Sequence, residues 1–231
     1  GVMDYGFSAY RIRPLYSADV VVQNPRQDSI ELAAANLTIA SFNVLNLFNG
    51  DGQGQGFPTE RGADSVSEYE RQLAKIVEAM VTLNADVFGL LELENDGYDA
   101  FSTIAQLTDA LNQAVGDSRY AYVDVGSEQL GTDAIASGII YRQDVVTPTG
   151  AASVLSSANS MSDENGPLFA DNNRPSLAQL FVHTETGNEF VVDVNHFKSK
   201  GSSCGAGDDH PLAGSCNLTR TRAAIAVTAW L

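Results

Sequence analysis

Three strand-like runs along this chain each lead to a polar residue that is suited to phosphate chemistry. The runs are LTIASFN, which ends at Asn43, DVFGLLE, which ends at Glu92, and FVVDVNHFKSK, which contains His196. A short apolar run that ends abruptly in such a residue is typical of a buried strand whose last side chain emerges at the edge of a sheet. The repetition predicts one shared site at the strand ends.

From residue 37 onward, strand-like runs alternate with amphipathic helical segments. Ser65 with Glu68, or Ser67 with Glu70, predicts a capping box at the start of the first helix. Further strands are expected at 120–125, 135–141, 177–183 and 189–197, and helices at 69–83, 101–115 and 219–231. This order indicates a layered α/β domain whose later part leans toward antiparallel sheet.

Two stretches fall outside this alternation. Residues 1–36 contain strand-like pieces and then a polar, proline-containing stretch at 24–36, which indicates the tail of an upstream module followed by a linker. Residues 151–173 are rich in Ser, Asn, Asp and Gly, which predicts a long surface loop. The main domain is therefore expected at 37–231.

The charge balance bears on the class of substrate. Lysine and arginine total 13 against 29 aspartates and glutamates, so the formal charge is 13 − 29 = −16. This disfavours nonspecific binding to nucleic acid, although screening by salt leaves a local basic pocket effective. Lys198 and Lys200, two of the three lysines, follow His196 within four residues. A proton donor beside concentrated positive charge suits an anionic substrate, and both lysines are candidates for binding phosphate.

Cys204 and Cys216 bracket a short segment rich in glycine and aspartate. A disulfide between them would stabilise the fold by about 3 kcal/mol in the chain-entropy model and would indicate an oxidising compartment. We therefore expect a secreted protein, extracellular or periplasmic; the alternative is two free thiols in a reducing compartment. No run approaches the ~18 apolar residues that a membrane span needs.

Glu92 and Asn43 are candidates for a metal site. A buried carboxylate needs a partner, and Mg²⁺ takes oxygen ligands from one or two carboxylates while leaving positions for phosphate and water. The alternative for Glu92 is an ion pair with an arginine or a capped turn. Asn43 could orient that carboxylate or contact a phosphoryl oxygen; the alternative is an Asx turn.

Three further residues suit the same chemistry. His196 could donate a proton to a leaving alkoxide, although a histidine beside a strand is more often a packed or surface side chain. Arg174, before Pro175, could hold two phosphate oxygens, or form a plain surface ion pair. Asp133 could lie near the metal or orient water, or serve a turn after Gly131. Two other histidines, His183 at an expected hairpin and His210 in the cysteine loop, have no neighbours that suggest catalysis.

Six segments in order resemble the endonuclease/exonuclease/phosphatase superfamily with the DNase I-like fold, and more narrowly its secreted bacterial nucleases. They are SFNVLNLF, RGADSVSEYERQLAKIVEAM, ADVFGLLELEND, GTDAIASGIIYR, NRPSLAQLF and VNHFKSKGSSC. The resemblance implies a four-layered α/β sandwich of two mixed sheets flanked by helices. It also implies hydrolysis of nucleic-acid phosphodiesters, DNA or RNA, by a monomer with Mg²⁺, Mn²⁺ or Ca²⁺.

The resemblance assigns roles residue by residue. Asn43 matches the first-strand asparagine, Glu92 the metal-binding glutamate, Arg174 a phosphate-contacting arginine and His196 the histidine near the leaving group, while Asp133 stands at a variable polar site position. Relatives continue into a Gly-Asp-(Phe or Leu)-Asn strand end and later an Asp-His pair, both of which would come after Leu231, where this sequence ends; His183 and His210 lie in other contexts. The expected fold is therefore incomplete at its C-terminus, with about half of the active site.

Two other functions remain open. A phospholipid or inositol phosphate phosphoesterase would share the fold, but membrane-acting relatives need an exposed aromatic hairpin, and the sequence indicates no aromatic cluster of that kind. A catalytically inactive fragment, or a calcium-stabilised module, would fit the acidic loops NGDGQGQG and CGAGDDH.

Overall fold

The computed structural model describes residues 1–17, 19, 21–25 and 35–231, and it divides into two compact units, Gly1–Ala35 and Asn36–Leu231. Most of the predicted linker, residues 26–34, lies outside the described residues. The interpretation of the first unit as the tail of an upstream module stays a prediction.

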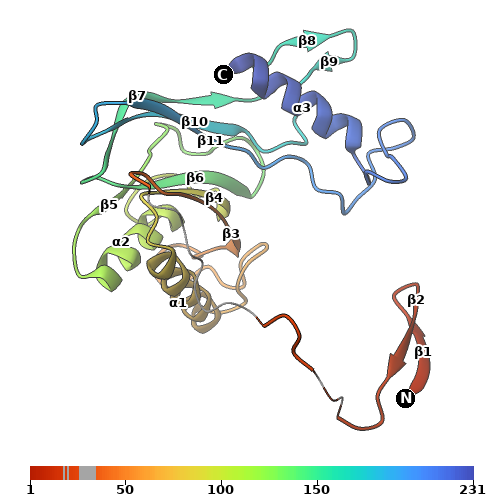
Figure 1. Cartoon of the computed structure of the whole chain (residues 1–231). Helices are drawn as coiled ribbons and strands as arrows, with labels where there is room; N and C mark the ends of the chain where they lie inside the picture. Colours follow the sequence, from red (N-terminus) through yellow and green to blue (C-terminus); the bar gives the residue numbers. More distant parts are fainter. Residues whose placement is uncertain (18, 20, 26–34) are drawn as a thin grey trace. The chain divides into compact units, whose positions relative to one another are not determined.

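The first unit contains an antiparallel hairpin of β1 (Val2–Gly6) and β2 (Ala9–Arg13) (Figure 1). Tyr5 pairs across the hairpin with Tyr10, their rings 4.9 Å apart, and Phe7 at the turn is 94% exposed. The expectation that the chain has no exposed aromatic cluster was therefore wrong. The cluster forms only when the turn brings residues that are five apart in sequence face to face.

The second unit is built on two sheets. The four-stranded sheet, in the order β3-β4-β6-β5, contains β3 (Ile39–Leu47), β4 (Val87–Glu94), β5 (Tyr120–Tyr122) and β6 (Ile135–Arg142). The three-stranded sheet, in the order β11-β10-β7, contains β7 (Val146–Leu155), β10 (Ser176–His183) and β11 (Glu189–Val194). The first sheet is mixed, because β3 and β4 are parallel and the other pairs antiparallel; the second is antiparallel.

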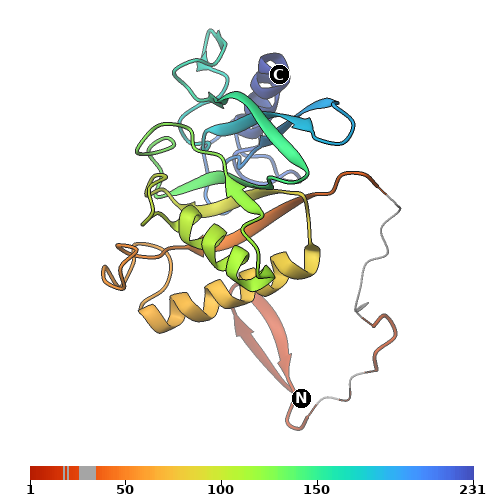
Figure 2. The same ribbon diagram turned by 90° about the vertical axis from the view of Figure 1, so that its left-hand side faces the viewer.

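Helices cover both sides of the stacked sheets (Figures 1 and 2). One core lies between the first sheet and the helices α1 (Val66–Leu83) and α2 (Thr103–Val115). A second core lies between the two sheets, and a third joins the end of β7 to α3 (Asn217–Trp230). This is the layered α/β sandwich that the sequence predicts, except that the three-stranded sheet is antiparallel rather than mixed.

The central strands β4 and β6 are buried on both faces, which explains their continuous apolar sequences. On β4, Phe88 and Leu90 enter the core beneath the helices, whereas Val87 enters the core between the sheets. On β6, Ile140 and Ile139 divide in the same way. A strand that is covered on both faces must be apolar along its whole length, so it reads as a continuous hydrophobic run.

The first helix begins as its sequence predicts. Ser65 is the N-cap, and its hydroxyl accepts a hydrogen bond from Glu68 N at 3.4 Å. Glu68 Oε2 reaches back to Asp64 N at 2.9 Å, one residue before the position of an ordinary capping box. Both hydrogen bonds use backbone N–H groups at the beginning of α1.

The expectation of a surface loop at 151–173 is only partly correct. Residues 151–155 continue β7 at the edge of its sheet, and Leu155 and Phe169 are buried against α3. β7 escaped detection because Pro148 and Gly150 interrupt its apolar pattern, which an edge strand tolerates. A two-residue ladder between β8 (Ser162–Asp163) and β9 (Gly166–Pro167) occupies part of the remainder.

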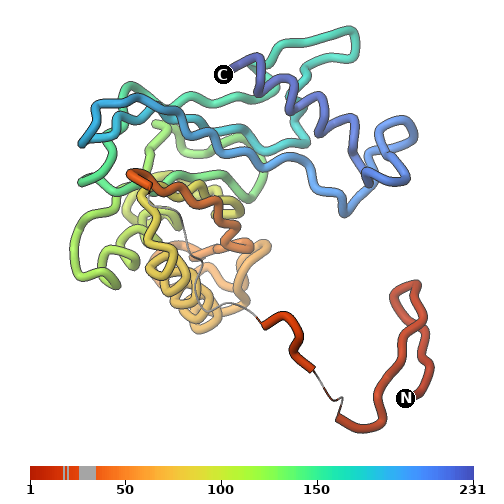
Figure 3. Tube along the Cα trace, in the orientation of Figure 1, coloured from red at the N-terminus to blue at the C-terminus, as the bar shows by residue number. Residues whose placement is uncertain are grey.

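The chain leaves β11 through the 195–216 segment and returns as α3, as the tube in Figure 3 shows. The predicted disulfide between Cys204 and Cys216 is present in this segment. Among the described residues, no helix combines the length and apolar character that a membrane crossing requires.

Candidate active site

Two adjacent strand ends form the floor of the candidate site. β3 and β4 are parallel neighbours, so their carboxyl ends meet at one edge of the sheet. The pairing shifts register between Asn43 and Leu47, where Leu45 and Asn46 have φ values of 58° and 49°. Glu92 on β4 has a φ of 67°. Left-handed backbone at residues other than glycine is strained and clusters at functional sites.

These irregular strand ends direct their polar groups at one carboxylate. Asn43 donates from Nδ2 to Glu92 Oε1 at 2.8 Å, and Asn46 N donates to Glu92 Oε2 at 3.2 Å. Asn43 Oδ1 in turn accepts from Leu45 N at 2.8 Å, which is the predicted Asx turn. The two alternatives for Asn43 are both realised, because its amide oxygen forms the turn while its nitrogen orients the carboxylate.

His196 comes to the same carboxylate from the second sheet. It lies two residues beyond β11, and its Nε2 is 3.8 Å from Glu92 Oε1. Burial lowers the pKa of His196, and the nearby Arg174 lowers it further, against the opposing effect of Glu92 and Asp133. Nδ1 is buried and has no hydrogen-bond partner within the described part of the chain. The imidazole is therefore mainly neutral near pH 7.

Asp133 and Arg174 form an ion pair beside the histidine. Arg174 Nε lies 3.1 Å from Asp133 Oδ2, and Arg174 N donates to the His196 carbonyl oxygen at 3.4 Å. Arg61 binds the other carboxylate oxygen of Asp133 at 2.6 Å. Burial alone would raise the pKa of Asp133, but Arg174, the amide of Ile135 and Arg61 together hold it below its usual value. Asp133 thus anchors two guanidinium groups next to His196.

The structure accordingly brings together five of the seven residues predicted for phosphate and metal chemistry: Asn43, Glu92, Asp133, Arg174 and His196. Their individual roles stay predictions. Arg61 joins the group although the sequence reasoning assigned it no role. No local signal distinguishes it, because its loop lies 72 positions from Asp133 along the chain.

Lys198 and Lys200 lie differently from what their proximity to His196 suggests. Lys198 Nζ donates to Ser202 Oγ at 2.9 Å, and Lys200 packs its methylene groups near Gly214 in the disulfide loop. Neither forms an ion pair with a residue that the structure describes. The side chains of both lysines thus lie against the disulfide loop or its flanks, and their role with phosphate stays a prediction.

Glu94, two residues after Glu92 at the end of β4, serves a different part of the fold. Its Oε2 accepts from Asn49 N at 2.8 Å and from Thr103 Oγ1 at 3.3 Å, which joins the loop after β3 to the start of α2. Burial, with a smaller contribution from Asp96, raises the pKa of Glu94 to about 7. The left-handed conformation at Glu92 breaks the alternation that would have kept the two carboxylates together.

The residues of the site fit a lightly anchored hard cation. Each carboxylate oxygen of Glu92 accepts one hydrogen bond and keeps further acceptor capacity. Mg²⁺ commonly binds through one or two carboxylates and takes its other ligands from water and phosphate. In the described residues no group of three His, Cys, Asp or Glu side chains is arranged to hold a metal ion, so the site does not form a protein-only cage.

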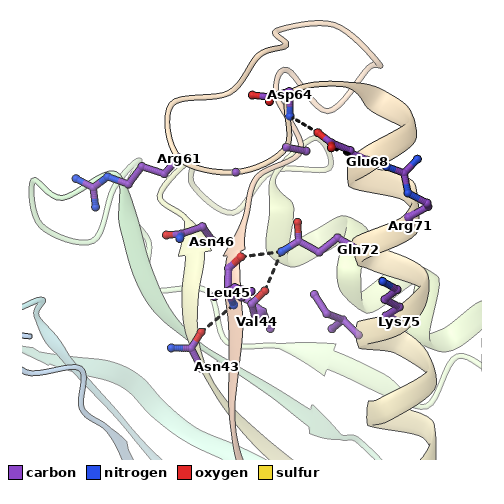
Figure 4. A pocket seen from close by; sticks show the side chains of 13 residues that line it. Asn43, Val44, Leu45, Asn46, Arg61, Asp64, Glu68, Arg71, Gln72 and Lys75 are labelled. Carbon is purple, nitrogen blue, oxygen red and sulfur yellow. Dashed lines mark hydrogen bonds and ion pairs between the residues drawn. The ribbon is translucent and has the colours of Figure 1, made fainter. Parts of the chain in front are cut away.

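A pocket of about 650 Å³ opens beside this cluster, between the end of β3 and α1 (Figure 4). Asn43 and Arg61 belong to both the pocket and the cluster. Gln72 of α1 donates from Nε2 to the carbonyl oxygens of Val44 and Leu45. The pocket is thus an extension of the site rather than a separate cavity.

The fold and the site together define a two-sheet α/β domain with a carboxylate, amide, guanidinium and imidazole cluster at one sheet edge.

No protein-family model matches the chain, and no curated protein matches it. Similar solved structures include an endonuclease/exonuclease/phosphatase family protein from Bacteroides thetaiotaomicron, with 20% identity and a TM-score of 0.41 over 68% of this chain and 49% of that one.

A family member from Bacteroides vulgatus has 13% identity and a TM-score of 0.45 over 84% of this chain and 59% of that one. The human Nocturnin catalytic domain with bound sulfate has 12% identity and a TM-score of 0.41 over 82% of this chain and 58% of that one. The chain spans about half to three-fifths of the length of these structures. Similarity at this level concerns the outline of the fold and carries nothing about activity.

Proposed function

We propose that this chain carries the metal-binding and phosphate-binding part of a hydrolase that cleaves phosphodiesters of nucleic acid, DNA above all and RNA as the second choice. The observation that carries the proposal is the environment of Glu92. Its strained backbone, its two hydrogen bonds from the β3 end and the imidazole 3.8 Å away are typical of a site built for chemistry rather than for stability.

Each residue then has a distinct task. Glu92, oriented by Asn43, would hold Mg²⁺ or Mn²⁺, with Ca²⁺ as a further candidate; a bound divalent cation polarises a phosphoryl oxygen and offsets its charge. Arg174, fixed by Asp133, binds phosphate oxygens. A water molecule attacks the phosphorus in line as the bond to the sugar oxygen breaks. His196, mainly neutral at pH 7, is suited to accept a proton from that water at Nε2, and the departing sugar oxygen takes its proton from solvent.

The disulfide supports a further part of the proposal, that the protein works in an oxidising compartment, secreted or periplasmic. A test for free thiols in the untreated, denatured protein addresses it directly. One disulfide and no reactive thiol is the expected result. Two reactive thiols in protein isolated from its natural source would contradict the assignment.

The decisive experiment is hydrolysis of plasmid DNA, and of bis(4-nitrophenyl) phosphate, in Mg²⁺ with and without EDTA. It is to be run on this chain and on a form extended at its C-terminus. His196→Ala should lower the rate by about 10²–10⁴-fold with little loss of DNA affinity, because it removes proton transfer and not binding. Absence of hydrolysis from both forms, or a loss below about tenfold in the variant, would refute the proposal.

One observation favours a second candidate, a phosphoesterase that acts on phospholipids. The exposed aromatic side chains Tyr5, Phe7 and Tyr10 of the β1–β2 hairpin are of the kind that membrane-acting relatives use. Leakage from phosphocholine-bearing liposomes that is abolished by Phe7→Ser, together with absence of DNA cleavage, would replace the nuclease by this candidate. Leakage without headgroup release would indicate a membrane-binding module and no enzyme.

A further inference from the structure

We infer that the pocket beside α1 binds the polynucleotide strand that flanks the scissile phosphate, with Arg71 and Lys75 contacting its phosphates. This inference rests on the proposed function and specifies its substrate, because it requires a strand of several nucleotides rather than a single phosphate group. The pocket, of about 650 Å³, is in the size range of ligand-binding clefts.

The position of the pocket makes it continuous with the reacting groups. Its lining includes Asn43, which contacts Glu92, and Arg61, which contacts Asp133 at 2.6 Å. A phosphate held at Glu92 and Arg174 would therefore have the pocket directly beside it. The next nucleotides of the same strand have this space available without any movement of the described elements.

The cations of the pocket are available for new partners. Arg71 and Lys75 are four residues apart on α1, so they lie one above the other on the same face. Both are exposed, and the ion pair of Arg71 with Glu68 is long, at 3.8 Å, between side chains that are 64% and 46% exposed. Such pairs contribute little to stability. Lys75 forms no ion pair with any residue that the structure describes.

The two carboxylates of the pocket lie at the Arg71 end of this path, where Glu68 is 3.8 Å from Arg71. Asp64 and Glu68 are joined by a hydrogen bond from Asp64 N to Glu68 Oε2 at 2.9 Å, at the beginning of α1. Figure 4 shows them at one end of the pocket, with Lys75 and Asn43 toward the other. A polynucleotide strand that leaves the site between Asn43 and Lys75 would therefore pass the Lys75 ammonium group before it reaches the Glu68 carboxylate.

The charge pattern favours a strand over a smaller ligand. Three of the 13 cationic side chains of a chain with net charge −16 line this one pocket. A mononucleotide or a lipid headgroup offers phosphate at one place, whereas Arg71 and Lys75 are separated by about one helical turn, roughly 5.4 Å. Successive phosphates of a polynucleotide can occupy both positions.

The test is binding of a fluorescein-labelled 12-nucleotide DNA single strand, followed by anisotropy at several salt concentrations. Arg71→Gln/Lys75→Gln should raise the Kd about tenfold at 0.1 M salt, and should reduce the salt slope by about 1.4, since each phosphate contact on a single strand accounts for ~0.7. Both substitutions are at exposed helical positions with good helix formers, so the fold should be kept. Arg71→Lys should retain most of the affinity.

Arg119→Gln is the matched control, because it removes one positive charge next to β5, at the opposite edge of the same sheet from β3. It should change the Kd less than either single variant in the pocket. Equal effects of Arg119→Gln and Arg71→Gln would mean that only net charge matters and would overturn the inference. So would an unchanged salt slope in the double variant, or a 12-nucleotide strand that the wild type binds no better than a mononucleotide.

Hydrolysis of bis(4-nitrophenyl) phosphate separates this inference from the proposed function. That diester has no flanking nucleotides, so Arg71→Gln/Lys75→Gln should hydrolyse it at the wild-type rate while its KM for DNA rises. Normal cleavage of both substrates by the double variant would refute the role of the pocket and leave the phosphodiesterase intact. Failure of both wild-type forms to cleave either the diester or DNA, with oligonucleotide binding that still depends on Arg71 and Lys75, would refute the catalytic proposal alone.

Discussion

Gln72 on α1 donates one side-chain amide to two carbonyl oxygens of the β3 end, that of Leu45 at 2.7 Å and that of Val44 at 3.0 Å. These are the carbonyls of the segment in which Leu45 and Asn46 adopt left-handed backbone. The helix therefore holds the strand end in the conformation that presents Asn46 N to Glu92. Gln72 is a positioning residue, since no contact joins it to Glu92 itself in the described structure.

Gln72→Ala should weaken this support. Loss of one part-buried and one exposed hydrogen bond is expected to lower the free energy of unfolding by about 1–2 kcal/mol, and kcat for a phosphodiester should fall while KM changes little. Chemical denaturation and steady-state kinetics measure the two effects. Gln113→Ala, at an exposed position of α2, is the control and should change neither. Wild-type kcat in Gln72→Ala would show that the strand end keeps its conformation unaided.

Glu92→Gln should abolish the response to metal. The side chain keeps its size, but the charge that binds a divalent cation is lost, and an amide nitrogen would face the donor Nδ2 of Asn43. We expect hydrolysis to fall at least about 100-fold, and Mg²⁺ to stop raising the melting temperature. Glu185→Gln, on the exposed turn between β10 and β11, serves as the control. Retention of the Mg²⁺-induced shift in Glu92→Gln would place the cation elsewhere.

The pH dependence of activity should report on His196. Its pKa is held below the ordinary value of about 6.5, first by burial and then by Arg174. The rate should therefore stay high down to a pH below 6.5 and then fall as His196 is protonated. The free energy of unfolding should also decrease as the pH falls. Between the folded-state and unfolded-state pKa values of His196, the unfolded chain binds a proton that the folded chain does not.

The same histidine offers a sharper test by NMR titration. Arg174→Gln should raise the midpoint of His196, since the nearby guanidinium disfavours the imidazolium, whereas Glu92→Gln should lower it, since the carboxylate favours the charged form. Opposite shifts in the two variants would establish that both groups face the ring. A shift of the same sign in both would contradict the arrangement of the cluster.

Asp133→Asn should loosen two guanidinium groups at once. Arg174 is only 14% exposed, so it would remain largely buried beside a neutral partner. We expect KM for a phosphodiester to rise about tenfold through misplacement of Arg174. Because its folded-state pKa is lowered, Asp133 stabilises the fold above its unfolded value of about 3.9, and this contribution disappears as the pH falls through the folded-state pKa. The stability difference between wild type and variant should shrink accordingly in acid.

Removal of the disulfide by Cys204→Ser/Cys216→Ser should lower the free energy of unfolding by about 3 kcal/mol, because the unfolded chain regains the freedom of a short closed loop. Denaturation with and without a reducing agent measures the effect. The wild type should lose a similar amount on reduction, and the variant nothing further. Equal stability of all four samples would show that the loop is held by its other contacts, such as those of Asp209 with Cys204 N and Cys216 N.

Most of the layered fold could be predicted because its central strands are buried on both faces and its first helix has a clear cap. Phe88, Leu90 and Ile140 produce continuous apolar runs, and Ser65 marks the start of α1. β7 was not predicted, since an edge strand with Pro148 carries no such pattern. The aromatic pair of Tyr5 and Tyr10 depends on a hairpin turn that composition does not reveal.

The site divides in a similar way. Asn43, Glu92 and His196 could be predicted because each follows an apolar strand. Arg61 and Gln72 could not, since their importance arises from contacts with Asp133 and Leu45, each far away in sequence. The two lysines after His196 were grouped with it by proximity in sequence alone, whereas their side chains contact Ser202 and the vicinity of Gly214.

The cluster around Glu92 draws on segments near residues 43, 92, 133, 174 and 196, from both sheets. Contacts between segments so far apart in sequence form late, because the entropy of closing long loops opposes them. During refolding, secondary structure and the compact α1–β3–β4 region should therefore appear before any catalytic competence. Recovery of the hydrolysis proposed above would then be a more stringent report of complete assembly than circular dichroism, because a chain trapped with only one sheet docked would have the secondary structure of the native protein without its site.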